Sequence, residues 1–156
     1  MKIFNATLII LFILSLNVAA AEISGVPRIT DGDTIKIFNK RIRFHGIDAP
    51  EKKQICIKNS KEYSCGEEPT NALKRKIGGK PVSCKVQDKL DRYKRYIGVC
   101  FLGNVDLNKW MVINGYAVAY RRYSKDYIED ENYAKKKKIG LWSGYFIHPK
   151  KWRKLN

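Results

Sequence analysis

The chain has 156 residues, of which 44% are hydrophobic and 12% aromatic, which suits one compact domain and leaves no room for a second large core. This composition excludes a disordered tail protein. Lysine and arginine number 31 against 15 aspartate and glutamate residues, and the resulting formal net charge of +16 favours a polyanionic partner.

The N-terminal residues have the features of a secretory signal peptide. Lys2 precedes an apolar run at 8–16, and small residues at 18–21 follow, as is typical of a cleavage site. We therefore expect residues 1–21 to be removed and residues 22–156 to form the mature domain, secreted or periplasmic. An uncleaved membrane anchor is the alternative, but a run of nine residues is far shorter than the ~20 that span a bilayer.

Short alternating apolar and polar steps predict five strands. Three of them form a β-meander at 26–30, 34–38 and 41–47, with tight turns between them. Two more strands, at 82–86 and 96–102, are separated by a polar stretch and are expected to form a hairpin with a long loop.

About three helices are expected around these strands. Acidic residues and a proline at 67–69 mark the start of the first helix, which ends near Gly78. Residues 105–115 and 127–139 form two amphipathic stretches, the second closed by Gly140. This order of elements favours a mainly β fold with α-helices, a five-stranded Greek-key barrel of the OB type, over a doubly wound sheet.

The four cysteines predict two disulfides, since export leads to an oxidising compartment. If the hairpin is centred on Arg92, Cys84 and Cys100 lie opposite each other within bonding range. The second pair, Cys56 and Cys65, closes a short loop, and free buried thiols are the alternative. A zinc site is not credible, because the cysteines are separated by 8, 18 and 15 residues, without the spacing of paired zinc ligands.

Carboxylates gather at the ends of strands that are expected to be neighbours. Asp31 and Asp33 share one turn, while Asp48 and Glu51 follow the third strand, and Arg43 lies between the two groups. Hard oxygen ligands that lie close together suit Ca²⁺. Each aspartate taken singly is better explained as a turn former, so it is the combination that indicates a functional site.

Several spaced segments carry a family resemblance over nearly the whole mature chain. They are ITDGDT at 29–34, RFHGIDAPE at 43–51, DRYKR at 91–95, NGYA at 114–117 and AKKKKIGLW at 134–142. In these segments and in their order, the chain resembles the staphylococcal-nuclease-like, or thermonuclease, family of secreted Ca²⁺-dependent nucleases. The resemblance implies an enzyme that hydrolyses phosphodiester bonds.

The resemblance also implies a role for each acidic residue. It implies that Asp33 and Asp48 are Ca²⁺ ligands, together with the backbone carbonyl of Ala49, and that water and substrate phosphate complete the coordination shell. It implies that Glu51 is the general base toward the attacking water, whereas Asp31 supports the turn.

The resemblance implies that Arg43 and Arg95 bind the scissile phosphate. Attack of water on an anionic phosphodiester requires charge neutralisation, which a divalent cation and two guanidinium groups supply. Solvated surface charge is the alternative for each arginine.

Two residues depart from the family pattern. Lys94 stands where a glycine is usual, so a positive φ there would strain a lysine, and Ala49 replaces a threonine but keeps the carbonyl.

Aromatic and basic residues indicate a nucleic-acid surface. Tyr93, Tyr120 and Tyr123 are candidates for stacking on bases of DNA or RNA, with single-stranded or locally unpaired substrates favoured. Packing at the edge of the core is the alternative for Tyr120 and Tyr123. Lys135–Lys138 and the acid-free stretch from Lys150 to Lys154 attract phosphate without sequence specificity.

The expected function is that of a monomeric, secreted nuclease that requires Ca²⁺ and cleaves DNA and RNA with little sequence specificity. The resemblance implies 3′-phosphate ends, and no stable membrane association is expected after signal cleavage. A catalytically inactive OB-fold module that binds nucleic acid explains the charge, but it does not explain Glu51 together with both arginines. A cationic membrane-active or polysaccharide-binding protein explains the charge alone.

Overall fold

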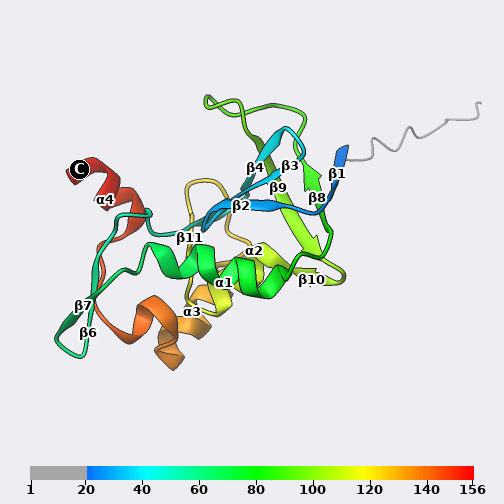
Figure 1. Ribbon diagram of the computed structural model, residues 1–156. Coiled ribbons are helices and arrows are strands. Elements are labelled where there is room, and N and C mark those ends of the chain that lie inside the picture. Colours follow the sequence, from blue (N-terminus) through cyan, green and yellow to red (C-terminus); the bar gives the residue numbers. More distant parts are fainter. Residues whose placement is uncertain (1–20) are drawn as a thin grey trace, which may run out of the picture.

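The computed structural model describes residues 21–156, and its central feature is one curled β-sheet (Figure 1). Neighbouring strands are antiparallel, except that β4 and β9 are parallel. In their order across the sheet, the strands are β1 (Ala21–Gly25), β8 (Val82–Val86), β9 (Tyr96–Leu102), β4 (Lys40–Phe44), β3 (Thr34–Ile37) and β2 (Arg28–Asp31), with β10 (Val105–Asp106) paired to β9.

The two edge strands of this sheet are consecutive in the chain. β1 pairs with β8 and β2 pairs with β3, and only Val26 and Pro27 lie between β1 and β2. Pro27 has no amide hydrogen to continue a strand ladder, so the chain bends there. Because one bent segment supplies both edges, the sheet curls around a single core. The predicted mainly β fold of the OB type is confirmed.

The five predicted strands correspond to β2, β3, β4, β8 and β9, and the structure adds the edge strand β1 and several shorter strands. The predicted third strand is divided, because a turn at His45 and Gly46, where Gly46 has a φ of 73°, separates β4 from β5 (Ile47–Asp48). β5 pairs with β11 (Val118–Ala119). The polar segment that follows forms a hairpin of β6 (Cys56–Lys58) and β7 (Lys61–Tyr63).

Within residues 21–156 the α-helices are α1 (Glu67–Ile77), α2 (Leu107–Ile113), α3 (Ile128–Lys137) and α4 (Pro149–Leu155), with a 3₁₀ turn η1 (Gly140–Ser143). The first three match the predicted helices. Gly78 ends α1 with a left-handed φ of 56°, whereas Lys138 rather than Gly140 is the left-handed residue that ends α3. α4 is not among the predicted helices, although Pro149 at its first position is a start signal.

The main core lies inside the curled sheet and against α1 and α2. α2 buries Leu107, Met111 and Val112 completely, as its predicted apolar face requires. A second, smaller apolar cluster lies under the β6–β7 hairpin and comprises Cys56, Cys65, Val118 and Leu141. The hairpin and the C-terminal part of the chain are thus packed together, outside the barrel core.

Both predicted disulfides, Cys84–Cys100 and Cys56–Cys65, are present, and they account for all four cysteines. The β8–β9 register places Cys84 opposite Cys100, as the hairpin centred on Arg92 predicts. By the loop-closure argument, a bridge across 16 residues contributes roughly 3 kcal/mol to the free energy of unfolding.

The predicted signal peptide, residues 1–21, lies outside the described residues except for Ala21. Ala21 begins β1 and is paired with Val86 of β8. From Ala21 to the C-terminus, no helix has the length and apolar character needed to cross a membrane. Cleavage of the signal peptide therefore stays a prediction.

A buried carboxylate joins α3 to β11. Glu131 of α3 is 0% exposed, and its carboxylate accepts hydrogen bonds from the Ala119 amide at 3.1 Å, from Arg121 at 2.5 Å and from Lys135 at 2.7 Å. Burial acts to raise the pKa of Glu131, but the bonds from Arg121 and Lys135 outweigh it and hold this pKa below its ordinary value. Since β11 pairs with β5, Glu131 also supports the strand that ends at Asp48.

We expect Glu131→Gln to lower the free energy of unfolding by about 1–3 kcal/mol at pH 7, because it removes charge-assisted bonds from a buried acceptor. The folded pKa lies below the ordinary 4.5, so this stabilisation is present above pH 4.5 and is lost as the pH falls through the folded pKa. Urea denaturation at pH 7 and at about pH 3 measures the difference between variant and wild type. A difference that is equal at both pH values would show that the ionised carboxylate is not its source.

Candidate active site

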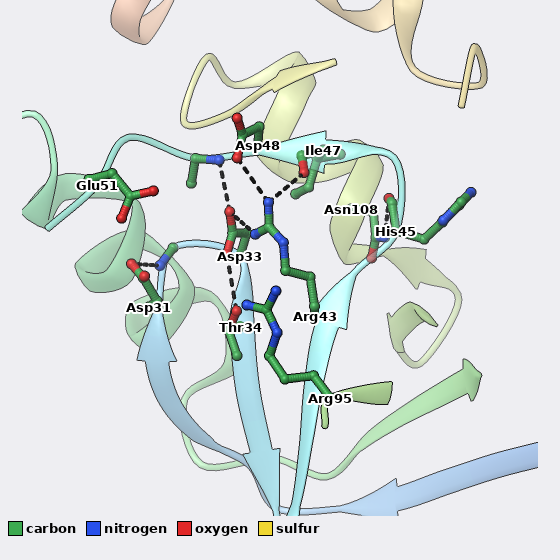
Figure 2. Close-up of polar contacts among 12 residues, drawn as sticks. Asp31, Asp33, Thr34, Arg43, His45, Ile47, Asp48, Glu51, Arg95 and Asn108 are labelled. Carbon is green, nitrogen blue, oxygen red and sulfur yellow. Dashed lines mark hydrogen bonds and ion pairs between the residues drawn. The ribbon is translucent and has the colours of Figure 1, made fainter. Parts of the chain in front are cut away.

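Arg43 of β4 lies between two buried carboxylates (Figure 2). Its guanidinium forms ion pairs with Asp33 and with Asp48, where Nη2 lies 2.9 Å from Oδ1. Nη2 also donates to the carbonyl of Ile47 at 3.3 Å. Asp33 is 5% exposed and Asp48 is 1% exposed, and buried carboxylates at such positions require a paired cation. Arg43 therefore permits the two acids to lie close together.

The turn between β2 and β3 positions Asp33. An added Cβ at Gly32 would lie 2.5 Å from Cβ of Pro69 and 2.9 Å from Cβ of Ala49, so only glycine permits this close approach. Asp31 closes the turn by accepting the Gly32 amide at 2.7 Å. Oδ2 of Asp33 accepts the Ala49 amide at 3.0 Å. The Asp-Gly-Asp turn is thus docked onto the loop that follows β5.

The acids of the site have unequal proton affinities. Burial acts to raise the pKa of Asp33, but the charge of Arg43 outweighs burial and holds this pKa below its ordinary value. Burial raises the pKa of Asp48, although Arg153 and Arg43 act against it. Burial and the charge of Asp33 raise the pKa of Asp31 to about 6. Burial is the first cause of both raised values, so it is the interior position of these acids, rather than a lack of paired arginines, that raises their pKa.

The groups near Asp33 and Asp48 that could bind a metal ion do so through oxygen atoms. Between residues 21 and 156, no three His, Cys, Asp or Glu side chains come together as a metal cage. Asp33 and Asp48 contact one guanidinium, so they are also within reach of one cation, and the Ala49 backbone adjoins both. Two carboxylates and a carbonyl are the hard donors that Ca²⁺ accepts, with water and phosphate as its further ligands. The donor set fits Ca²⁺.

Glu51 lies in the loop after β5, three residues beyond Asp48. Its amide donates to the side chain of Gln54 at 3.3 Å, and a Cβ at Gly66 would collide with its carbonyl oxygen, so the loop is tightly packed. Figure 2 shows the Glu51 carboxylate on the same side of the site as Asp31. The Glu51 side chain is 31% exposed, which leaves the carboxylate accessible to water.

The turn that ends the β8–β9 loop positions Arg95. Asp91 accepts the amides of Tyr93 and Arg95 through Oδ1, and Nε of Arg95 through Oδ2, all at 2.9 Å. Arg43 pairs with Ile97, so Arg95, two residues earlier, lies on the same face as Arg43. Figure 2 shows its side chain extending toward Arg43. The charge of Arg95 is nevertheless paired with Asp91 rather than with the buried carboxylates.

The three candidate tyrosines lie in two places. Tyr93 is 52% exposed, and its ring centroid lies 5.1 Å from the guanidinium carbon of Arg95. Tyr120 and Tyr123 pack edge to face with centroids 4.8 Å apart, and the Tyr120 amide donates to the Gly46 carbonyl at 2.8 Å. Tyr93 is therefore beside a candidate phosphate-binding arginine, whereas the other two tyrosines flank the turn between β4 and β5.

Two residues of the site are missing from the sequence prediction. Arg153 of α4 donates from Nη1 to Asp48 at 3.0 Å and to Glu51 at 2.7 Å, and from Nη2 to Asp48 at 2.9 Å. Gln54 is 0% exposed, and its side chain donates to the Ile147 carbonyl at 2.5 Å. In the sequence, Arg153 is one of several C-terminal basic residues. Such a stretch indicates general affinity for phosphate, but it does not predict that Arg153 lies in the active site.

Lys94 has a left-handed backbone with a φ of 58°, as its place in the family pattern suggests. A residue with a Cβ is strained in this conformation by about 1–2 kcal/mol. We expect Lys94→Gly to raise the free energy of unfolding by about 0.5–1 kcal/mol, since the entropy of glycine in the unfolded chain offsets part of the gain. Thermal unfolding measures this, with Lys89→Gly in the same loop as a destabilising control. A lower midpoint for Lys94→Gly than for wild type would rule out the strain.

Comparison with known proteins adds independent information. Residues 41–144 match the family model described as staphylococcal nuclease homologue. An uncharacterized endonuclease of Escherichia coli O157:H7 is 37% identical over 143 residues, which cover 86% of this chain and 87% of that protein. The probable staphylococcal-like nuclease CAN3 of Oryza sativa subsp. japonica is 38% identical over 117 residues, which cover 73% of this chain and 28% of that protein.

A further relative has a different kind of name. The succinoglycan biosynthesis protein ExoI of Rhizobium meliloti (strain 1021) is 34% identical over 128 residues, which cover 80% of this chain and 66% of that protein. The family model includes Arg43, Asp48, Glu51 and Arg95, and it ends before Arg153. The matched region therefore holds most of the candidate site, but neither Asp33 nor the C-terminal helix.

Proposed function

The chain belongs to the staphylococcal nuclease family, and from that premise we propose that this nuclease is a Ca²⁺-dependent endonuclease that cleaves DNA and RNA with little sequence specificity. The observation that carries the proposal is the pair of buried carboxylates, Asp33 and Asp48, held on Arg43 with Glu51 close by. A module that only binds nucleic acid has no need to bury two acids, because they repel the phosphate backbone.

Asp33, Asp48 and the carbonyl of Ala49 would hold Ca²⁺ in this proposal. When bound, Ca²⁺ supplies stabilisation of negative charge on the phosphoryl oxygens. Asp33 is fixed for this role by the Ala49 amide, and Asp48 is fixed by its strand pairing with Val118. The protein therefore supplies both carboxylates from rigid positions.

Arg43 and Arg95 bind the scissile phosphate in the proposed mechanism. Their planar guanidinium groups can donate two parallel hydrogen bonds to phosphate oxygens and stabilise the charge that develops there. Arg43 is held by the buried acids, and Arg95 is held by Asp91 and lies beside the ring of Tyr93. Each arginine is thus oriented before the substrate arrives, which reduces the entropy lost on binding.

Glu51 accepts a proton from the attacking water. Its carboxylate is accessible to solvent and is attached to the same loop as Asp48, so the water is activated close to the bound phosphate. Attack on phosphorus then breaks the bond to the 5′-oxygen, which takes a proton from solvent and leaves as a 5′-hydroxyl, so the phosphate stays on the 3′ side. Exposed Tyr93 stacks on a base, and stacking favours single-stranded or locally unpaired substrates without reading their sequence.

We propose that the protein acts as a monomer outside the cytoplasm. We propose cleavage of the signal peptide after Ala21, which leaves residues 22–156 as the mature domain in the periplasm or outside the cell. The two disulfides support an oxidising compartment. Its high net positive charge favours nucleic acid as the partner.

Excess EGTA should abolish cleavage of DNA while the protein stays folded. Folding should survive because Arg43 and Arg153 already compensate Asp33 and Asp48 without a metal ion. A gel assay on single-stranded DNA measures cleavage, and far-ultraviolet circular dichroism measures folding. Full activity in EGTA would remove Ca²⁺ from the mechanism, and unfolding in EGTA would assign it a structural role.

Glu51→Gln should lower kcat for DNA cleavage by about 10²- to 10⁴-fold with little change in KM, because it removes the proton acceptor and keeps the shape. Arg95→Ala should lower kcat by about 10²- to 10³-fold through lost charge stabilisation. The double variant should lose less than the product of both factors if the two groups act on one transition state. Steady-state kinetics with saturating Ca²⁺ measures these effects.

The matched control is Glu62→Gln, which removes an exposed carboxylate on the β6–β7 hairpin and should leave kcat unchanged. Activity of Glu51→Gln equal to that of wild type would overturn the assignment of the base. A wild-type protein that binds DNA but shows no cleavage at millimolar Ca²⁺ would instead establish the inactive binding module.

A further inference from the structure

Arg153 joins the C-terminal helix to two carboxylates that the proposed reaction uses. We propose that Arg153 is a positioning residue of the active site, which holds Asp48 and Glu51 in the cation-free protein and competes with Ca²⁺ for Asp48. The inference rests on the function proposed for this site. Its basis is the three hydrogen bonds from one guanidinium, two to Asp48 and one to Glu51.

Arginine side chains occupy both oxygens of Asp48. Oδ1 accepts from Arg43 at 2.9 Å and from Arg153 at 3.0 Å, and Oδ2 accepts from Arg153 at 2.9 Å. Asp48 is 1% exposed, so the surrounding protein leaves little room for an additional ligand beside these donors. A divalent cation on this carboxylate would also meet the positive charge of both guanidinium groups at short range. One arginine must therefore move when a cation binds.

Arg153 is the arginine that can move. The Arg43 side chain is 13% exposed, belongs to a central strand and is also paired with Asp33. The Arg153 side chain is 35% exposed and belongs to the last helix of the chain. Withdrawing Arg153 disturbs no sheet pairing, whereas withdrawing Arg43 would leave Asp33 unpaired in the interior.

The helix that carries Arg153 is held mainly at its start. α4 spans seven residues, of which Pro149 is buried, and Leu155 near its end is 63% exposed. The segment before it is fixed by the bond from Gln54 to Ile147 and by contact of the His148 ring with Phe146, at a centroid distance of 5.5 Å. Figure 1 shows α4 at the outer edge of the molecule. A helix this short is unstable alone, so half-buried Trp152 and the ion pairs of Arg153 hold its C-terminal end.

The same guanidinium also bonds to the proposed general base. Nη1 of Arg153 donates to Oε1 of Glu51 at 2.7 Å while it donates to Asp48. This donor occupies Oε1 of Glu51 and leaves less room beside it for a hydrogen bond from water. Departure of Arg153 from Asp48 therefore frees Glu51 in the same step. Arg153 thus couples occupation of the cation site to exposure of the base.

Isothermal titration calorimetry with CaCl₂, in the absence of nucleic acid, tests the competition on the full chain as purified. Arg153→Gln should bind Ca²⁺ about three- to thirtyfold more tightly than wild type, because two ion pairs no longer have to be broken. Arg153→Lys keeps the charge without the planar fork and should fall between them. Lys151→Gln is the control, since this exposed residue of the same helix loses equal charge and should change the affinity less than about twofold.

Hydrogen exchange of residues 150–156 gives a second readout. Addition of Ca²⁺ should speed exchange in wild type, whereas in Arg153→Gln exchange should be fast with and without Ca²⁺. Equal Ca²⁺ affinity of wild type and Arg153→Gln, absence of binding to either, or slower exchange of α4 with Ca²⁺ would each overturn the proposal. DNA cleavage by wild type is measured separately. If Arg153→Gln does not bind Ca²⁺ more tightly but wild type cleaves DNA, the proposal for Arg153 fails and the nuclease proposal stands. If Arg153→Gln binds Ca²⁺ more tightly but wild type does not cleave DNA, the nuclease proposal fails and the competition for Asp48 stands.

Discussion

The guanidinium of Arg43 connects three segments of the chain, because it pairs with Asp33 before β3, extends from β4 and pairs with Asp48 at the end of β5. Loss of such a buried partner costs about 3–5 kcal/mol, since the carboxylates would remain uncompensated in the interior. The surrounding fold satisfies this constraint. The bent segment 21–31 closes the sheet around β3 and β4, and Gly32 permits the turn to pack against the loop after β5.

This acidic site lies within a chain of net charge +16. The excess of lysine and arginine attracts a phosphate backbone from any direction, without choosing the point at which the backbone is cut. Buried Asp33 and Asp48 repel a phosphate unless a cation lies between them and the substrate. In the mechanism that we propose, the chemistry therefore depends on local positive charge, from Arg43, Arg95 and a bound cation, and not on the general charge of the surface.

The C-terminal part of the chain forms a second support for the site, outside the barrel. Glu131 of α3 holds β11, which pairs with β5 and so supports the position of Asp48. Gln54 connects the Glu51 loop to the segment before α4, and the disulfide Cys56–Cys65 holds the hairpin beneath them. The barrel thus positions the acid pair and the arginines, whereas the C-terminal part controls the environment of Asp48 and Glu51.

Local patterns in the sequence were sufficient for five strands of the sheet and for both disulfides, but not for the edge strand β1. Symmetry of the hairpin about Arg92 places Cys84 opposite Cys100, because each strand advances by the same distance per residue. The pairing of Asp48 with Arg153 was accessible only in the tertiary structure. The two residues lie 105 positions apart, and the lysine-rich stretch around Arg153 has the pattern of a solvated surface. Their contact depends on how the whole C-terminal part packs on the barrel, and no local period or spacing encodes that packing.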